Sequence, residues 1–291
     1  MANPKQVSNF INLNQDIIDE LITLAFKEDI PYEDLSTNAI YQGQAAQVEL
    51  LAKQAGVICG LDLFKRVFLH LDPEVQFESL VRDGDRVANQ ETLMVIKASV
   101  NTLLSGERIA LNFLQRMSGI ATATRRFVDA LEGSGIKLLD TRKTTPVYRP
   151  LEKYAVRVGG GYNHRYSLSD QIMLKDNHVA AAGGVKEAIQ AAKAYAPFVK
   201  KIEIEVEDLD MVRAAVEAGA DIIMLDNMDH DTMEEAIAII NGQAIIEASG
   251  NFTWDNVADY KDLAIDYISS GAITHSAGIL DLSLKHLKVR K

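Results

Sequence analysis

The 291-residue sequence contains one cysteine, Cys59. A single cysteine permits neither an intrachain disulfide nor a zinc site built from cysteines, and it favours a reducing cytoplasm. No run of the sequence approaches the roughly 18 apolar residues of a membrane-spanning helix. The first residues, Met1 to Lys5, have neither the basic start nor the apolar stretch of a secretory signal. These absences predict a cytoplasmic protein with no membrane association.

Basic residues are outnumbered by acidic ones, since 30 Lys and Arg residues against 41 Asp and Glu residues give a formal net charge of −11. Nucleic-acid binding depends mainly on Lys and Arg contacts to phosphates, so this balance argues against a nucleic-acid partner. Residues 140–178 are the exception, with seven basic residues against four acidic ones. A basic segment within an acidic chain indicates a small anionic ligand rather than a polyanion.

The second half of the chain alternates apolar runs with amphipathic segments. The runs predict strands near 136–140, 171–175, 201–206, 221–225, 244–248 and 265–269. The intervening segments predict helices near 150–158, 184–195, 208–218, 230–240 and 254–262. This alternation is typical of parallel βαβ units. Six strands are too few for a closed eight-stranded barrel, so we expect a barrel that is short, open or completed by other segments.

The first half of the chain has a different pattern of predicted helices and strands. It predicts an amphipathic helix at 15–28, short β-like runs from about 45 to 99, and a helix that opens at Gly60-Leu61-Asp62. A long helical stretch follows at 103–131, with a possible break near Ser118-Gly119. This mixture predicts an α+β domain. We therefore expect an α+β domain at 1–115, a catalytic barrel at 116–274, and a final segment, 275–291, that packs back on the first domain.

Each of the six apolar runs ends on a chemically capable residue. The carboxyl ends of barrel strands converge on one mouth, where catalytic groups stand. In chain order these ends carry Arg142 with Lys143, then Lys175, Glu205, Asp226, Ser249-Gly250 and Ser270-Gly271. The pattern predicts an enzyme that acts on a heavily anionic substrate.

The basic strand ends allow more than one interpretation. Arg142 offers a planar fork for a carboxylate or phosphate and Lys143 a compact charge beside it, although both would also suit a solvated loop. Lys175 could bind an anion or, with a depressed pKa, act as a Schiff-base nucleophile. Its neighbour Asp176 favours the protonated, anion-binding state. We expect His178 to be a structural, hydrogen-bonded histidine.

The acidic and Ser-Gly ends suggest a second half of the site. Glu205 and Asp226 end consecutive strands about 4.8 Å apart, so they could share a hydroxyl pair or a Mg²⁺ ion. Glu203 has the same parity as Glu205, and one of the two could be a barrel-layer or edge charge. Ser249-Gly250-Asn251 and Ser270-Gly271-Ala272 close the last two strands, where barrels commonly bind phosphate. Two ordinary turns are the alternative.

Ordered motifs extend through nearly the whole chain. They are Gly106-Glu107-Arg108, Asp140-Thr141-Arg142-Lys143-Thr144-Thr145-Pro146, Gly159-Gly160-Gly161-Tyr162-Asn163-His164-Arg165, Lys175-Asp176-Asn177-His178, Ile202-Glu203-Ile204-Glu205, Leu225-Asp226-Asn227 and Glu247-Ala248-Ser249-Gly250-Asn251. In this order they closely resemble the quinolinate phosphoribosyltransferase family. One departure is Pro146-Val147-Tyr148-Arg149, where that family would have Pro-Gly-Leu-Arg; it affects loop geometry rather than chemistry.

The resemblance implies a fold and a reaction. The fold would be an amino-terminal sandwich followed by an open α/β barrel of about seven strands. The reaction would join quinolinate to 5-phosphoribosyl-1-pyrophosphate (PRPP) with Mg²⁺, releasing pyrophosphate and CO2 and yielding nicotinate mononucleotide for NAD synthesis. The protein would act as a homodimer or a higher oligomer.

The resemblance also implies residue roles. Thr141, Arg142, His164, Arg165 and Lys175 would line the quinolinate site, with Arg108 supplied by the partner subunit of the dimer. Lys143 would lie beside the pyrophosphate. Glu205 and Asp226 would hold ribose hydroxyls or Mg²⁺. The phosphate would be bound by Ser249, Gly250, Asn251, Ser270, Gly271 and Ala272. Lys143, Lys175, Glu205 and Asp226 would be the catalytic residues.

Three other functions fit parts of the pattern. A Schiff-base aldolase would use Lys175 or Lys143 as its nucleophile, and borohydride trapping would reveal it. A related pyrophosphorylase could accept a different base through a few changed pocket residues. A non-catalytic binding module would not need the complete set of Arg, Lys, Glu and Asp residues.

Overall fold

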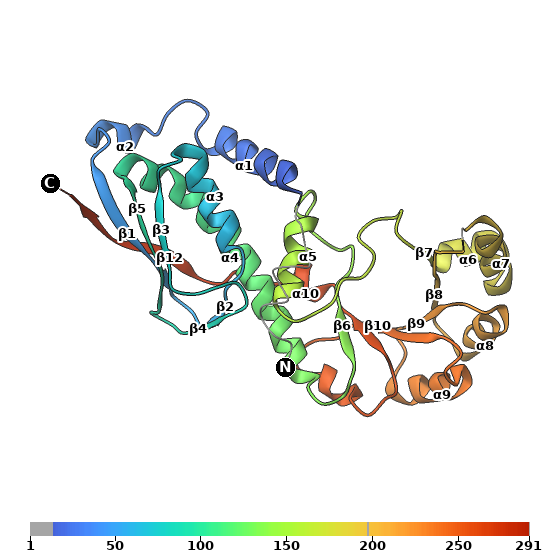
Figure 1. The fold of residues 1–291 in the computed structure, drawn as a ribbon. Helices are drawn as coiled ribbons and strands as arrows, with labels where there is room; N and C mark the ends of the chain where they lie inside the picture. The colour runs from blue at the N-terminus through green and yellow to red at the C-terminus, as the bar shows by residue number, and fades with distance from the viewer. Residues whose placement is uncertain (1–13, 197, 291) are drawn as a thin grey trace. The chain divides into compact units, whose positions relative to one another are not determined.

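The computed structural model describes residues 14–196 and 198–290, which form two compact units (Figure 1). The first contains the chain up to Arg125 together with Pro150–Gly160 and Ala277 onward, and the second contains Arg126–Arg149 and Gly161–Ser276. This division differs from the expected boundaries because Pro150–Gly160 falls in the first unit. In the described part of the chain, no helix is both long and apolar enough to cross a bilayer.

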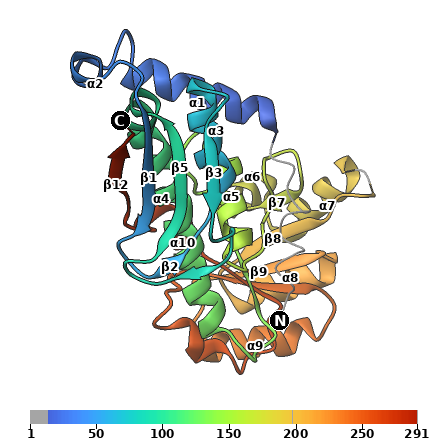
Figure 2. The same ribbon diagram turned by 60° about the vertical axis from the view of Figure 1, so that its left-hand side comes forward.

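The first unit is an α+β structure, as its sequence predicts. Its main sheet is antiparallel with the strand order β12-β1-β5-β3. The elements are α1 (Gln15–Asp29), α2 (Leu35–Ile40), β1 (Ala45–Ala52), β2 (Gly56–Val57), α3 (Leu61–Leu71), β3 (Gln76–Ser79), β4 (Arg86–Val87), β5 (Thr92–Ser99), most of α4 (Val100–Ala130), most of α5 (Arg149–Val158) and β12 (Leu282–Val289). Figure 2 shows β1, β5 and β3 side by side. Helix α3 packs on the sheet, since the rings of Phe68 and Phe77 of β3 lie 6.4 Å apart.

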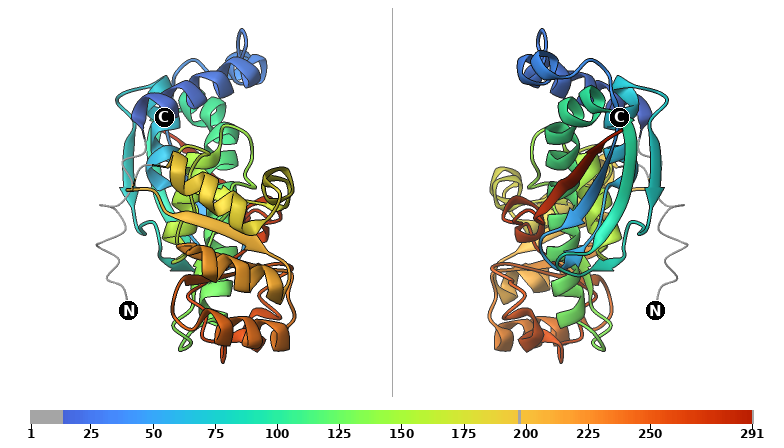
Figure 3. Two further views of the ribbon diagram at one scale, coloured as in Figure 1. Left: turned by 90° about the vertical axis from the view of Figure 1, so that its right-hand side faces the viewer. Right: turned by 90° about the vertical axis from the view of Figure 1, so that its left-hand side faces the viewer.

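The end of the chain completes this sheet. Strand β12 runs antiparallel to β1, with Leu284 opposite Leu50 and Leu282 opposite Ala52. The right-hand view of Figure 3 shows the red β12 beside the blue β1. All four of these side chains are buried, so the strand contributes its apolar face to the core of the first unit.

Two buried polar contacts explain why α5 belongs to the first unit. Glu152 is fully buried and accepts hydrogen bonds from Arg116 of α4, at 3.2 Å from Nε and 2.8 Å from Nη2. The Tyr154 hydroxyl donates to Asp83 at 2.9 Å. Removing one partner of a buried ion pair costs about 3–5 kcal/mol, so these contacts hold α5 strongly in place. They could not be read from the helical pattern of the segment.

Helix α4 is continuous, and the expected break near Ser118-Gly119 is absent. Gly119 does not kink the helix; it allows the backbone of α4 to pack closely against the segment around Gly278. A Cβ atom added there would lie 2.0 Å from the carbonyl oxygen of Gly278, so any side chain would displace the segment that leads into β12. Helical glycine costs about 1 kcal/mol relative to alanine, and the close approach of two backbones accounts for it here.

The second unit contains six parallel strands in the order β6-β11-β10-β9-β8-β7. Its elements are β6 (Lys137–Leu139), β7 (Ile172–Leu174), α6 (Asp176–Ala182), α7 (Val185–Tyr195), β8 (Ile202–Val206), α8 (Leu209–Ala218), β9 (Ile222–Asp226), α9 (His230–Ile240), β10 (Ile245–Ser249), the 3₁₀ helix η2 (Val257–Tyr260), β11 (Tyr267–Ser269) and α10 (Ala272–His275). Figure 1 shows α7, α8 and α9 along the outer side of the strands. The predicted α/β alternation is confirmed.

The sheet is an open barrel. Strands β6 and β7 are its two edges, and one further parallel bridge joins Leu139 of β6 to Tyr162. The described residues therefore hold six strands and a single added bridge where the family resemblance implies about seven strands. The helix expected at 254–262 is wrong in type and length, since only η2 forms there. The Asn256 side chain accepts from the Thr253 N–H at 2.7 Å, a local turn that competes with an α-helix.

Side-chain caps fix where the barrel helices begin. Asp208 accepts from the Met211 N–H before α8, and Asp229 accepts from the Thr232 N–H before α9, each at 2.8 Å. Such N-caps satisfy otherwise unpaired backbone donors and contribute about 1 kcal/mol each. The short connections from strand to helix thereby hold the strand ends, and the chemical groups on them, in fixed positions.

The departure at Val147 produces local backbone strain. The Tyr148 N–H donates to the Thr145 carbonyl at 3.1 Å, which closes a turn with Pro146 and Val147 at its centre. Val147 has φ +61°, in the left-handed region that this turn position normally reserves for glycine. A β-branched residue there is unfavourable, and no burial compensates because the side chain is 73% exposed.

We predict that Val147→Gly raises the free energy of unfolding by about 1 kcal/mol, because relief of left-handed strain exceeds the added chain entropy of glycine. Thermal and urea unfolding would measure the change. Val199→Gly is the matched control, since Val199 is also an exposed valine but does not have a positive φ; it should be neutral or destabilising. A less stable Val147→Gly protein would contradict this account of the turn.

Candidate active site

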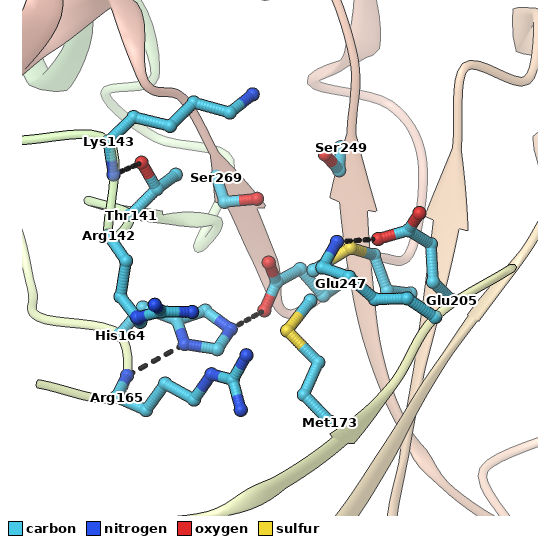
Figure 4. A pocket seen from close by; sticks show the side chains of 12 residues that line it. Thr141, Arg142, Lys143, His164, Arg165, Met173, Glu205, Glu247, Ser249 and Ser269 are labelled. Atoms are coloured by element: carbon cyan, nitrogen blue, oxygen red, sulfur yellow. Dashed lines mark hydrogen bonds and ion pairs between the residues drawn. The ribbon is translucent and has the colours of Figure 1, made fainter. Parts of the chain in front are cut away.

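A cavity of about 290 Å³ lies at the carboxyl ends of the barrel strands (Figure 4). All of its lining residues belong to the second unit. Eight of the residues singled out from the sequence line it, namely Thr141, Arg142, Lys143, His164, Arg165, Lys175, Glu205 and Ser249. Four further residues line it that were not singled out as site residues: Met173, Met224, Glu247 and Ser269.

Strand register explains why these side chains meet. Glu205 lies opposite Met224, Met224 opposite Glu247, and in the next layer Asp226 lies opposite Ser249 and Ser249 opposite Ser269. Side chains on a strand alternate between faces, so all of these residues point to the same side of the sheet. The cavity is thus built from every second residue near the strand ends.

The remaining predicted residues lie elsewhere. Asp226 ends β9 opposite Ser249 but does not line the cavity. Gly250 and Asn251 line an adjoining cavity of about 220 Å³ that shares Ser249. Ser270, Gly271 and Ala272 line neither cavity. Arg108 is exposed on α4 in the first unit, and its contribution to a partner's site stays a prediction.

Arg142 and Arg165 form the most electropositive part of the lining. Arg165 donates from Nη1 to the Gln171 carbonyl at 3.2 Å, and burial, reinforced by the charge of Arg142, lowers its pKa. The Nε atom of Arg142 is buried and has no hydrogen-bond partner among the described residues. Two guanidinium groups held together with an unsatisfied donor favour an anionic ligand between them.

Lys143 and Lys175 are positioned by different means. The Lys143 N–H donates to Thr141 Oγ1 at 3.0 Å, and its carbonyl accepts from the Thr274 hydroxyl at 2.8 Å. Its side chain passes Gly271, where an added Cβ would lie 2.8 Å from Lys143 Cδ. Lys175 pairs through Nζ with Glu205 Oε2. Gly271 therefore leaves space for the Lys143 side chain, whereas the charge of Lys175 is partly neutralised by Glu205.

The loop that carries His164 is held to β6 by Asp140. Asp140 is fully buried and accepts from the His164 N–H at 2.9 Å and from Asn163 Nδ2 at 2.6 Å. These contacts extend the bridge between Leu139 and Tyr162. The loop therefore places the His164 side chain inside the open barrel. His178 is a hydrogen-bonded structural histidine, as expected, since it accepts from the Lys175 N–H at the start of α6.

His164 faces two buried carboxylates. Its Nε2 atom lies 3.2 Å from Glu203 Oε1 and 3.5 Å from Glu247 Oε2. Glu203 is fully buried and also accepts from Gln171 Nε2. Burial alone would lower the pKa of His164, but the hydrogen bonds and charges of both glutamates outweigh it and raise the pKa to about 10. The three side chains titrate together, so the cluster retains a proton beyond the one on Nε2 at neutral pH, and that proton belongs to the cluster rather than to the ring.

The second ring nitrogen of His164 limits where protons can reside. Nδ1 accepts a hydrogen bond from the Arg165 N–H at 2.7 Å, so it carries no proton in this arrangement. Nε2 then carries the ring proton and donates it towards the glutamates. The three donor atoms lie within 4.8 Å of one another, which would suit a metal ion. However, a protonated Nε2 has no lone pair for a metal, so we assign a proton to this cluster.

Glu247 could have been recognised from the sequence by the same reasoning that singled out Glu203, which is a buried residue of the barrel interior. Each acid interrupts an apolar run of a parallel strand, where both faces are normally covered. Glu247 has the parity of Ser249, and Glu203 the parity of Glu205, so each shares a face with a predicted site residue. Attention to strand ends alone missed Glu247, which is the third residue of β10.

An open α/β barrel whose mouth is lined by arginine and lysine side chains is typical of an enzyme that acts on an anionic substrate. Sequence comparison identifies the family. The family model for the quinolinate phosphoribosyl transferase N-terminal domain matches residues 34–118, and the model for the C-terminal domain of the same family matches residues 120–285. The chain therefore belongs to the quinolinate phosphoribosyltransferase family.

Individual relatives agree with this assignment. The chain is 43% identical over 265 residues to a probable carboxylating nicotinate-nucleotide pyrophosphorylase of Bacillus subtilis, covering 91% of this chain and 92% of that protein. It is 38% identical over 271 residues to the human carboxylating nicotinate-nucleotide pyrophosphorylase, covering 91% and 90%. The crystal structure of NadC from Streptococcus pyogenes is similar with a TM-score of 0.93 and 52% identity, over 97% of this chain and 100% of that one.

Proposed function

We propose that this protein converts quinolinate and PRPP to nicotinate mononucleotide, pyrophosphate and CO2 in de novo NAD synthesis. The observation that carries the proposal is the cavity at the barrel mouth, where Arg142, Arg165, Lys143 and Lys175 converge. Its volume of about 290 Å³ suits a small ligand. Membership of the family supplies the identity of the substrates.

The charges of the substrates explain the cations. Quinolinate carries two adjacent carboxylates, and PRPP carries a phosphate and a pyrophosphate, so the two substrates repel each other. Fixed cations must offset that repulsion before the reacting atoms can approach. We assign Arg142, Arg165 and Lys175 to quinolinate, with Thr141 and His164 beside them. The buried Nε of Arg142 has no hydrogen-bond partner among the described residues, so a substrate carboxylate would satisfy this donor.

The other substrate would occupy the opposite side of the mouth. Lys143 would contact the pyrophosphate, and the backbone of Ser249-Gly250-Asn251 and Ser270-Gly271-Ala272 would bind the 5-phosphate. Gly250 has φ +155°, and an added Cβ would lie 3.2 Å from Asn227 Oδ1, so a side chain is disfavoured where the phosphate is expected.

The residues proposed for Mg²⁺ fit that ion chemically. Glu205 and Asp226 offer carboxylate oxygens, the ligands that Mg²⁺ prefers, at the ends of adjacent strands. Bound Mg²⁺ would neutralise charge on the pyrophosphate leaving group. The same carboxylates would hold the ribose hydroxyls and favour positive charge that develops on the anomeric carbon. Lys175 keeps Glu205 oriented towards the cavity.

The direct test is to mix the purified protein with quinolinate, PRPP and Mg²⁺. We expect nicotinate mononucleotide, pyrophosphate and CO2 in equal amounts, measured by chromatography and trapped CO2. Nicotinate should fail to replace quinolinate, because loss of one carboxylate leaves a buried cation unpaired. Turnover of nicotinate but not quinolinate would instead assign the chain to a related pyrophosphorylase.

We predict that Arg142→Ala lowers kcat/KM for quinolinate by about two to three orders of magnitude, because an unpaired buried charge costs about 2–5 kcal/mol. Arg142→Lys should recover only part of the loss, since lysine lacks the planar fork. Arg213→Ala is the control, because Arg213 is exposed on α8 and pairs only locally with Asp210. Near-normal catalysis by a folded Arg142→Ala protein would refute the assignment of this side chain.

We further propose a homodimer in which Arg108 completes the partner's site. Arg108→Ala and Arg142→Ala proteins should each be inactive, whereas a mixture that exchanges subunits should regain about a quarter of wild-type activity, because half of the dimers are mixed and each has one complete site. Activity after mixing and native mass would be measured together. A dimer without regained activity would place Arg108 in its own subunit's site.

A further inference from the structure

Glu247 is the buried acid of the cavity that the proposed substrate contacts leave without a role. Its side chain is 2% exposed and lines the cavity floor. One carboxyl oxygen, Oε2, lies 3.5 Å from His164 Nε2. The other, Oε1, has no hydrogen-bond partner among the described residues. Figure 4 shows the carboxyl group between His164 and Ser269. An unsatisfied buried carboxyl oxygen is costly, so it indicates a function in the cavity.

The proton inventory around His164 favours a protonated Glu247. An imidazolium would need a proton on Nδ1, but Nδ1 already accepts the Arg165 N–H. A neutral ring with its proton on Nε2 satisfies both contacts, and any further shared proton then resides on a carboxyl. Glu203 already accepts a hydrogen bond from Gln171, whereas Oε1 of Glu247 has no partner among the described residues and has room for a proton. Burial raises the pKa of Glu247 and the charge of Glu203 raises it further, and together they outweigh the contact with His164, which lowers it.

The proposed reaction requires an acid in this cavity. When CO2 leaves, the pair of electrons of the broken C–C bond stays on the ring carbon beside the cationic nitrogen. That carbon must gain a proton to give nicotinate mononucleotide. Arg142 and Arg165 do not deprotonate in proteins. Lys175 is paired with Glu205, and the Nε2 proton of His164 points at the glutamates.

We propose that Glu247 is the general acid that protonates the ring carbon as CO2 departs. The C–CO2 bond breaks, its electron pair takes the proton of Oε1 to form a C–H bond, and the electrons of the O–H bond remain on the carboxylate. Water then returns a proton to Glu247. This role rests on the proposed function and deepens it, because it separates the decarboxylation machinery from the cations that bind the substrate.

The experiment separates the two halves of the reaction. In a single turnover, pyrophosphate release reports glycosyl transfer, and CO2 release reports decarboxylation. Glu247→Gln keeps the shape and a hydrogen-bond acceptor for His164 but has no acidic proton. We expect pyrophosphate release to stay within about threefold of wild type while CO2 release slows about 10²- to 10⁴-fold, the usual contribution of a general acid. The quinolinate mononucleotide should accumulate.

Two further variants guard against a purely structural effect. Glu247→Met, which is apolar and similar in volume, should show the same separation. Glu247→Ala should regain CO2 release when formate is added, because a small acid can occupy the space, with no change in pyrophosphate release. Glu217→Gln is the control, since Glu217 is exposed on α8 and pairs with Lys186. Melting temperatures would confirm that each variant folds.

The possible outcomes are distinct. Equal slowing of both releases, or variants that fail to fold, would make Glu247 a structural partner of His164 and overturn the proposal. Unchanged CO2 release would also overturn it. If the wild-type protein released neither pyrophosphate nor CO2 from these substrates, the proposed function itself would fail, whatever the variants did.

Discussion

The parallel register of six short strands is the constraint on which the rest of the site depends. Because β6 to β11 end at the same edge and present every second side chain to one side, groups from six separate segments converge without long loops. The gap between the edge strands β6 and β7 of the open barrel is equally important for the site. The loop after Gly161 can enter between β6 and β7 only because the barrel does not close, and it brings His164 and Arg165 into the cavity. A closed barrel would leave no path for that loop.

The cavity combines charges that would be unstable apart. Arg142 and Arg165 repel each other, while Glu203 and Glu247 are both buried and face the same nitrogen of His164. The basic and acidic side chains offset part of the free-energy cost of burying each other's charge. The compensation is incomplete, because Nε of Arg142 and Oε1 of Glu247 have no hydrogen-bond partner among the described residues. Strain of this kind is usually retained where a ligand relieves it. The unsatisfied donor matches a substrate carboxylate, and the unsatisfied oxygen matches a carbon that must be protonated.

Sequence alone predicted the parts of this structure that follow from local patterns. Alternating segments predicted the six strands and most helices. Strand ends identified five of the lining residues, because a residue after an apolar parallel strand has few places to lie except the mouth, and the family resemblance added Thr141, His164 and Arg165. Residues whose role depends on distant partners were missed. Glu247 contacts His164, which is 83 positions earlier by numbering, and α5 joins the first unit through Arg116 and Asp83. No local window contains both members of such pairs.

A pocket lined only with cations would bind quinolinate too well in its starting state. Tight binding of both carboxylates stabilises the substrate and not the transition state, in which one carboxylate loses its charge as CO2. The uncharged acid proposed here would avoid this problem, because it would add no attraction for the departing group and would donate only as electrons accumulate on the ring carbon. Burial and the nearby charge of Glu203 raise the pKa of Glu247, which favours the protonated acid more than an exposed position would. If Glu247 has the proposed role, the apolar residues around it on β10 serve the chemistry as well as the core.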